Sequence, residues 1–273
     1  MKKHLSTILI AIILISGISL LLYPTVSDYI NTLNQAKDIT EYADAVSKTD
    51  DKKYEQMWNE AVAYNKDLAG KPSHWRLTEK EAEIYDDILD VSGTGIMAYI
   101  EIPKLNTSLP VYHGTDVNVL QIAVGHLEGS SFPVGGKSTH CVLSAHRGLP
   151  SAKLFTNLDK MAQGDVFYIR TLNETLCYEV SEINIVLPEE TEKLQISAGE
   201  DLCTLVTCTP YGVNTHRLLV KGKRITETND YDVRITADAM QIDPYMVAPV
   251  IAVPLIIILF IAVVTYKRKR NMR

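Results

Sequence analysis

Two long uncharged stretches, one near each end of the chain, restrict its folding more than any other feature. The first runs over 5–27 and the second over 244–266. A helix rises about 1.5 Å per residue, so each stretch is long enough to cross the roughly 30 Å hydrocarbon core of a bilayer. We therefore expect two transmembrane helices, with about 200 residues between them that can bury one sizeable core.

Basic residues flank the outer side of both stretches. Lys2 and Lys3 precede the first, and KRKR at 267–270 follows the second. Such flanks stay in the cytoplasm, so both termini are expected there and the segment between them on the outer face. A cleaved signal peptide is the alternative for the first stretch, although its apolar run is long and no A-x-A site follows. A buried core helix is the alternative for the second, but the basic residues after it are typical of a stop-transfer segment.

The charge of the chain is unevenly distributed. The two tails hold seven of the 27 basic residues, while all 33 acidic residues lie between the tails. The segment between the tails therefore carries a charge near −13, although the whole chain has only −6. Nucleic acids and anionic membrane surfaces select basic patches, so neither is an expected partner of this segment.

Two helices are predicted after the first span. Asp50 or Asp51 is placed to cap the first of them, and Gly70 to end it. A T-x-x-E capping box at 78–81 begins the second. The first helix is amphipathic, because its apolar residues have helical spacing, and both a solvated stalk and a functional role fit it. These residues are Tyr54, Met57, Trp58, Ala61 and Val62.

From about residue 95 the sequence changes to short β-rich runs separated by turns. This pattern is typical of an all-β barrel or sandwich. It contains no internal repeat, and 227–243 is interpreted as a linker into the second span. The runs are IMAYIEI, SLPVYH, STHCVLSAH, DVFYIR, TLCYEVSEINIVL, DLCTLVTC and HRLLVKGKRI.

The four cysteines are too few for a dense disulfide framework, and their spacing matches no zinc motif. Cys208 ends the run DLCTLVTC before a Thr-Pro pair, so a strand delivers its thiol to a loop. Cys203 points to the opposite face of that strand because side chains alternate. A strand cysteine is more often a buried hydrophobe than a nucleophile. We expect Cys141 and Cys177 to be buried in this way, with a bridge between their strands left open.

A thiol nucleophile needs a proton acceptor, and acyl transfer needs a group that stabilises the oxyanion. His146 closes the run STHCVLSAH, which places its ring at the rim of the predicted sheet. Arg217 follows Cys208 on the next predicted strand, beside His216. Alternation lets only one of these two neighbours face Cys208, and spacing alone does not decide which.

Three motifs in this order resemble a known family. TLVTC at 204–208 is similar to the T-L-x-T-C signature of sortases, with SAHRG at 144–148 before it and NTHRLLVKG at 214–222 after it. The resemblance extends from about residue 98 to residue 225. The C-terminal span is similar to that of class C sortases, which assemble pili.

The resemblance implies that Cys208 is the nucleophile, His146 the general acid and base, and Arg217 the residue that binds substrate and stabilises the oxyanion. It implies no metal and no cofactor. It also implies a mainly β fold, an eight-stranded sortase-type barrel with an N-terminal helical extension and two flanking transmembrane helices. The expected organisation is a cytoplasmic tail at 1–4, a transmembrane helix at 5–27, a helical extension with a candidate lid region at 28–94, the barrel at 95–226, a linker at 227–243, a transmembrane helix at 244–266 and a basic cytoplasmic tail at 267–273.

Class C sortases often have a lid, whose Asp-Pro-aromatic motif enters the active site. This chain has no such triplet, and KPSHW at 71–75 occupies the comparable region. Trp75, with His74 beside it, is therefore the candidate lid residue. Packing of this helical segment on the barrel is the alternative role for Trp75.

The expected function is that of a membrane-anchored extracellular transpeptidase on a Gram-positive cell surface. It would cleave LPxTG-like sorting signals between Thr and Gly and join pilin subunits through a lysine amine. A cell-wall peptidase similar to the NlpC/P60 group is one alternative, but there the cysteine normally precedes the histidine. A surface structural protein is another, although no LPxTG-like pentapeptide precedes Pro244. A catalytically silent sensor is a third.

Overall fold

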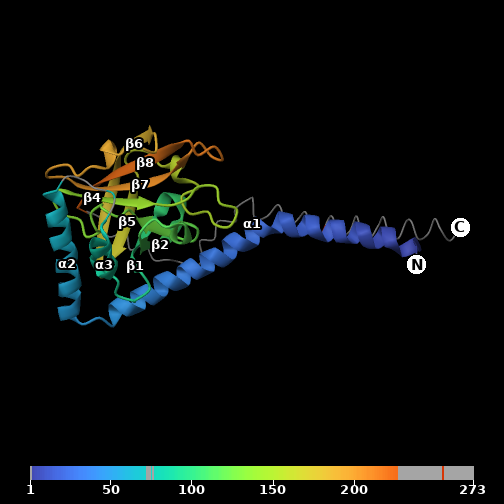
Figure 1. Ribbon diagram of the computed structural model, residues 1–273, viewed down its shortest axis with the longest axis horizontal. Helices are drawn as coiled ribbons and strands as arrows, with labels where there is room; N and C mark the ends of the chain where they lie inside the picture. Colours follow the sequence, from blue (N-terminus) through green and yellow to red (C-terminus); the bar gives the residue numbers. More distant parts are fainter. Residues whose placement is uncertain (1, 72–74, 76, 227–253, 255–273) are drawn as a thin grey trace. The chain divides into compact units, whose positions relative to one another are not determined.

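The structure is a computed structural model that describes residues 2–71, 75, 77–226 and 254. Its internal contacts divide the chain into two units, Met1–Ile30 with Asp230–Arg273, and Asn31–Asn229. The described elements, drawn in Figure 1, are α1 (Lys2–Ser47), α2 (Asp51–Ala69), α3 (Glu79–Asp87), β1 (Ile96–Ile102), η1 (Pro103–Leu105), β2 (Thr107–His113), α4 (Val117–Leu120), β3 (Val124–His126), β4 (Thr139–Ser144), η2 (Leu158–Lys160), β5 (Val166–Thr171), β6 (Glu174–Val186), η3 (Glu192–Leu194), β7 (Asp201–Thr209) and β8 (His216–Arg224).

The predicted first span lies within α1. Within the part of the chain that the structure describes, α1 is the one helix long and apolar enough to cross a membrane. Apolar side chains of its N-terminal part, such as Ile13 and Leu20, are exposed. The second predicted span falls outside the described residues except for Pro254, and the linker at 227–243 and the basic tail at 267–273 fall wholly outside them.

α1 continues well beyond the predicted span. Residues 28–47 fall in the predicted helical extension and are helical in the structure, where their side chains bond to the barrel. The hydroxyl of Tyr42 donates to the carbonyl of Met97 (3.0 Å), and the amide of Gln35 donates to the carbonyl of Ile122 (2.6 Å). These contacts join residues far apart in the sequence, so a local pattern could not have indicated them.

α2 and α3 begin at the predicted caps. The side chain of Asp50 accepts a hydrogen bond from the backbone N–H of Lys53, and the Thr78–Glu81 capping box is formed at the start of α3. The buried face of α2 contains Met57, Ala61, Asn65 and Leu68, so α2 packs on the domain and is not a solvated stalk. Val62, the last residue of the predicted apolar stripe, lies at its margin with 40% of its side chain exposed.

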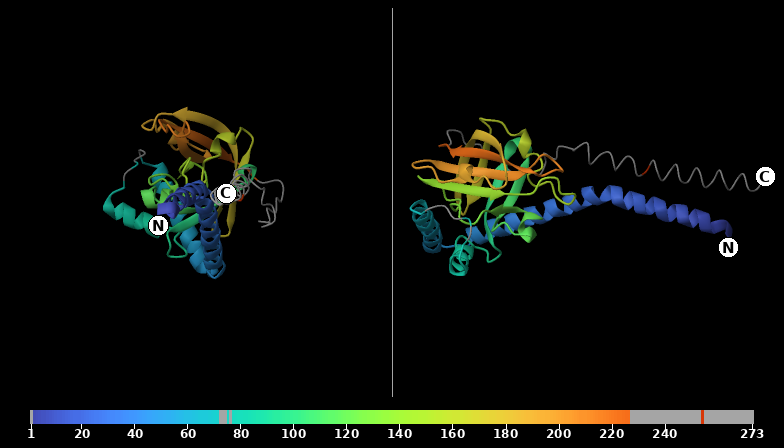
Figure 2. Two further views of the ribbon diagram at one scale, coloured as in Figure 1. Left: turned by 90° about the vertical axis from the view of Figure 1, so that its right-hand side faces the viewer. Right: turned by 45° about the horizontal axis from the view of Figure 1, so that its top comes forward.

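The β-rich part is a closed barrel of eight strands in the order β1-β2-β3-β4-β7-β8-β6-β5. Figure 2 shows this barrel from two further sides. The predicted mainly β barrel is thus confirmed. β3, which pairs parallel to β2 and antiparallel to β4, corresponds to none of the predicted β-rich runs because three residues are too few for a periodic pattern.

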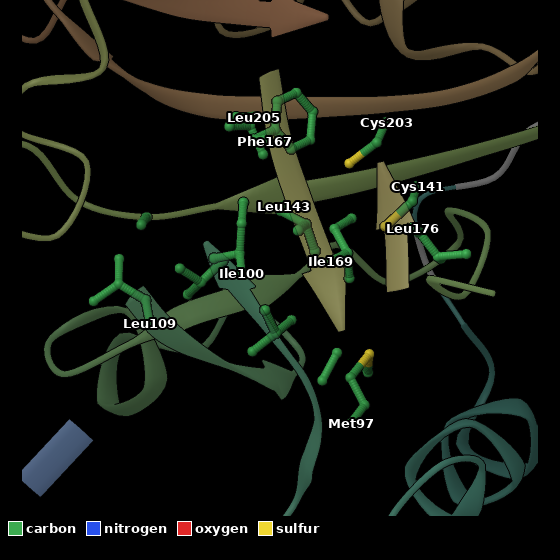
Figure 3. Packing of buried hydrophobic residues seen from close by; sticks show 14 of the residues in the cluster. Met97, Ile100, Leu109, Cys141, Leu143, Phe167, Ile169, Leu176, Cys203 and Leu205 are labelled. Atoms are coloured by element: carbon green, nitrogen blue, oxygen red, sulfur yellow. The ribbon is translucent and has the colours of Figure 1, made fainter. Parts of the chain in front are cut away.

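Side-chain alternation sends every second residue of β4 and β7 into the barrel core. Figure 3 shows Cys141, Leu143, Cys203 and Leu205 together in this core. Cys141 and Cys203 are register partners on the parallel strands β4 and β7, and both are free thiols. Cys177 is buried as predicted. The alternate residues of β4 and β7 are therefore left for the outer face of the barrel.

Candidate active site

The candidate site lies where β4, β7 and β8 run side by side. β7 pairs with β4 on one side and with β8 on the other, and Cys208 is the register partner of Arg217. His146 follows the end of β4 by two residues. The barrel thus brings three residues that are distant in the sequence to the same edge.

The two cysteines of β7 have opposite environments. Cys203 is wholly buried in the core, and burial raises the pKa of its thiol well above the usual value. Cys208 is half-buried and lines a groove on the outer face. The predicted difference between the two thiols follows from their odd spacing on one strand.

The register between β7 and β8 also separates Arg217 from His216. Arg217 lines the same groove as Cys208, whereas His216 is the register partner of Thr209 and is not among the residues that line it. The guanidinium of Arg217 donates to the backbone carbonyls of His216 (3.1 Å) and Asn214 (3.3 Å). These bonds orient the side chain. Of the two neighbours, it is therefore Arg217 and not His216 that lies on the same face as Cys208.

The groove has a volume of about 360 Å³. An apolar cluster forms its floor, with Val142, Val206, Leu194 and Leu219 packed together. His146 lies in its lining along with Cys208 and Arg217. A groove of this kind is typical of a binding site, because its apolar lining contributes affinity and its few polar groups fix the orientation of a ligand.

Trp75 also lines this groove and packs against its apolar floor. Trp75 lies between α2 and α3, so a residue that precedes the barrel in the sequence contributes to the lining of the groove. His74, the other candidate lid residue, lies outside the described residues, as do its neighbours at 72–73 and 76.

One wall of the groove was missed from the sequence. It is formed by the last residue of β6 and the segment that follows, and its lining residues are Val186, Leu187, Pro188, Glu190, Thr191 and Leu194. No motif marks this segment, because its role depends only on where the barrel places it. Thr115, Leu120 and Leu127 add to the lining from the region around β3 and were missed for the same reason.

A buried histidine ties this wall to the sheet. His140 lies on the same face of β4 as Val142, and its Nδ1 donates to the carbonyl of Gln195 (2.8 Å), which can only accept. Its Nε2 then accepts from the hydroxyl of Thr204 (2.7 Å). Burial lowers the pKa of His140 to about 4, so the ring is neutral at neutral pH. This pair of bonds fixes the residue next to Leu194 in the groove wall.

A closed eight-stranded barrel with a cysteine, a histidine and an arginine in one groove defines the sortase class of proteins. A family profile described as Sortase domain matches residues 100–225. Sortase C1 from Streptococcus agalactiae is 50% identical, its match covers 70% of this chain and 99% of that chain, and the TM-score is 0.69. Sortase C from Streptococcus pneumoniae is 44% identical, with 71% and 98% covered and a TM-score of 0.63.

A more distant relative is Sortase D of Bacillus subtilis (strain 168), which is 30% identical over 130 residues. That match covers 46% of this chain and 63% of the Bacillus protein, less than two thirds of its length. The chain belongs to the sortase family and, within it, to class C, the pilus sortases.

Proposed function

We propose that this chain is a cysteine transpeptidase that cleaves LPxTG-like sorting signals and joins pilin subunits to one another. The observation that carries the proposal is that Cys208, His146 and Arg217 line one apolar groove. Similarity to class C sortases supports the same reaction. The other residues that line the groove are mostly apolar, which suits the side chains of a peptide bound in an extended conformation.

In the proposed first half-reaction, the Cys208 thiolate attacks the carbonyl carbon of threonine in the Thr–Gly bond. Arg217 stabilises the negative charge that develops on the carbonyl oxygen. The C–N bond then breaks, and the imidazolium of His146 donates its proton to the departing glycine amine. A thioester between Cys208 and the threonine remains on the enzyme.

In the second half-reaction, a lysine amine of another pilin subunit attacks the thioester carbon. His146 takes a proton from this amine, the bond to sulfur breaks, and the Cys208 thiolate is restored. The product is an amide bond between two subunits. If water attacked in place of lysine, the product would be hydrolysed peptide, which is the result expected if the protein were instead a cell-wall peptidase.

The proposed location follows from the ends of the chain. The apolar part of α1 anchors the protein in the cytoplasmic membrane, with both termini on the cytoplasmic side. The barrel then lies on the outer face, where surface proteins with sorting signals are assembled. The proposed partners are therefore pilin subunits and the membrane itself.

The test uses the full-length protein in detergent, incubated with an LPxTG-type peptide and analysed by intact mass. We expect an adduct equal in mass to the N-terminal part of the peptide, located at Cys208. Addition of a lysine-containing acceptor should discharge this adduct into a joined product. Failure to form the adduct, with Cys208 still open to alkylation, would exclude the proposed substrate class.

We also propose that Trp75 covers the groove when no substrate is bound. Burial of a large apolar side chain stabilises the covered state by about 1.5 kcal/mol or more, which corresponds to about tenfold in population. Trp75→Ala should therefore raise the rate at which iodoacetamide alkylates Cys208 by roughly tenfold. Trp58→Ala is the matched control, because the ring of Trp58 stacks on Tyr54 in α2. Equal rates in all three proteins would contradict a covering role.

A further inference from the structure

The loop that carries His146 leaves the sheet just before this residue. β4 and β7 pair from Thr139↔Asp201 to Ser144↔Val206. The backbone of Ala145 makes the last two contacts, donating to the carbonyl of Val206 (3.1 Å) and accepting from the hydroxyl of Thr207 (2.8 Å). Among the described residues, no backbone hydrogen bond joins 146–149 to β7. The strand ladder therefore does not set the position of His146 relative to Cys208.

The side chain of Arg147 makes the next connection between these two strands. Its Nη1 donates to the hydroxyl of Thr209, which directly follows Cys208, over a long distance of 3.4 Å. Its Nη2 donates to the carboxylate of Asp159 in η2 at 2.5 Å. The guanidinium also lies over the ring of Tyr211, 5.8 Å from its centroid. The Arg147 side chain is only 9% exposed, whereas that of Asp159 is 45% exposed, so the guanidinium is buried and the carboxylate that it bonds faces water.

Tyr211, in the loop between β7 and β8, packs against the loop that carries His146. A Cβ atom on Gly148 would lie 2.9 Å from the ring of Tyr211, and Gly148 has φ +75°. Only glycine fits both the backbone conformation and the close ring. The loop bearing His146 therefore contacts the segment after Cys208 at two places, through Thr209 and through the ring of Tyr211.

We propose that Arg147 is a positioning residue that holds the ring of His146 in reach of the Cys208 thiol. This inference rests on the proposed function, in which Cys208 carries the acyl group while His146 exchanges protons with the leaving and attacking amines. Arg147 itself contacts neither the thiol nor the substrate in this account. It acts by fixing the backbone next to His146 against the backbone next to Cys208. A misplacement of about 1 Å between reacting groups can cost about a hundredfold in rate.

The kinetic test compares Arg147→Met and Arg147→Lys with the wild-type full-length protein. Arg147→Met removes both polar links, whereas Arg147→Lys keeps the charge but not the fork that reaches two partners. We expect kcat for the sorting-signal peptide to fall about tenfold to a hundredfold in Arg147→Met with KM nearly unchanged, and less in Arg147→Lys. A rise in KM with kcat unchanged would overturn the proposal.

Arg170→Met is the matched control for loss of a structural arginine. Arg170 also bonds a carboxylate and a hydroxyl, those of Glu101 (3.0 Å) and Thr175 (3.0 Å), but it lies on β5 and does not line the groove. We expect wild-type kcat per folded molecule from this control, with folding followed by thermal unfolding. An equal loss of kcat in Arg170→Met would show that the Arg147 effect is only structural.

A second readout needs no substrate and separates this inference from the proposed function. The rate of Cys208 alkylation at neutral pH is measured for wild type, Arg147→Met, His146→Ala and the double variant. If Arg147 acts through His146, Arg147→Met slows alkylation in the wild-type background and has no further effect in His146→Ala. An equal slowing in both backgrounds would show a direct effect of the Arg147 charge on the thiolate and would overturn the proposal. Lack of turnover by wild type, in contrast, would count against the sorting-signal reaction alone.

Discussion

Cys208→Ala is expected to abolish the joining of pilin subunits, with turnover reduced by at least about 10³-fold. The thiolate forms the bond that carries the acyl group, and among the described residues that line the groove no other cysteine can replace it in the thioester. The measurement is the appearance of covalently joined product on a denaturing gel, together with the acyl-enzyme adduct by intact mass. Both should be absent from the variant.

Cys203→Ala is the matched control, since Cys203 lies on the same strand five residues away but faces the core. Loss of its buried sulfur is expected to lower the free energy of unfolding by about 1 kcal/mol and to leave kcat per folded molecule unchanged. Thermal unfolding measures the first effect. Equal loss of joined product in both variants would contradict the assignment of Cys208 as nucleophile.

Arg217→Lys is expected to lower kcat by about a hundredfold, the second largest effect of a single change. The guanidinium of Arg217 is oriented by the carbonyls of Asn214 and His216 while it faces the groove. A lysine ammonium is a point charge on a flexible stem and cannot bond these carbonyls and the substrate oxygen with the same geometry. Single-turnover acylation by the peptide measures the effect directly.

The neighbouring variant His216→Gln controls for the Arg217 result. The Nδ1 atom of His216 shares a hydrogen bond with the hydroxyl of Thr215. His216 is the register partner of Thr209 and does not line the groove. We expect its acylation rate to equal that of the wild-type protein. A larger loss from His216→Gln than from Arg217→Lys would mean that the roles of the two neighbours are reversed.

Much of the barrel could be predicted because strands and helix caps have local signals. The run IMAYIEI coincides with β1, and Asp50 and Thr78 cap the helices for which they were proposed. β3 was missed. It owes its conformation to pairing with β2 on one side and β4 on the other, and a strand of three residues carries no periodic pattern of its own.

The candidate site shows the same division. The sequence by itself determined the reactive residue types, their order along the chain and the apolar anchor, since these depend on side-chain chemistry and on neighbours within a few residues. The tertiary structure alone decided that Arg217 and not His216 faces Cys208, that the segment after β6 walls the groove, and that Arg147 connects the loop of His146 to the strand of Cys208. Strand register and barrel closure place residues far apart in the sequence against one another, and no local pattern encodes those distances.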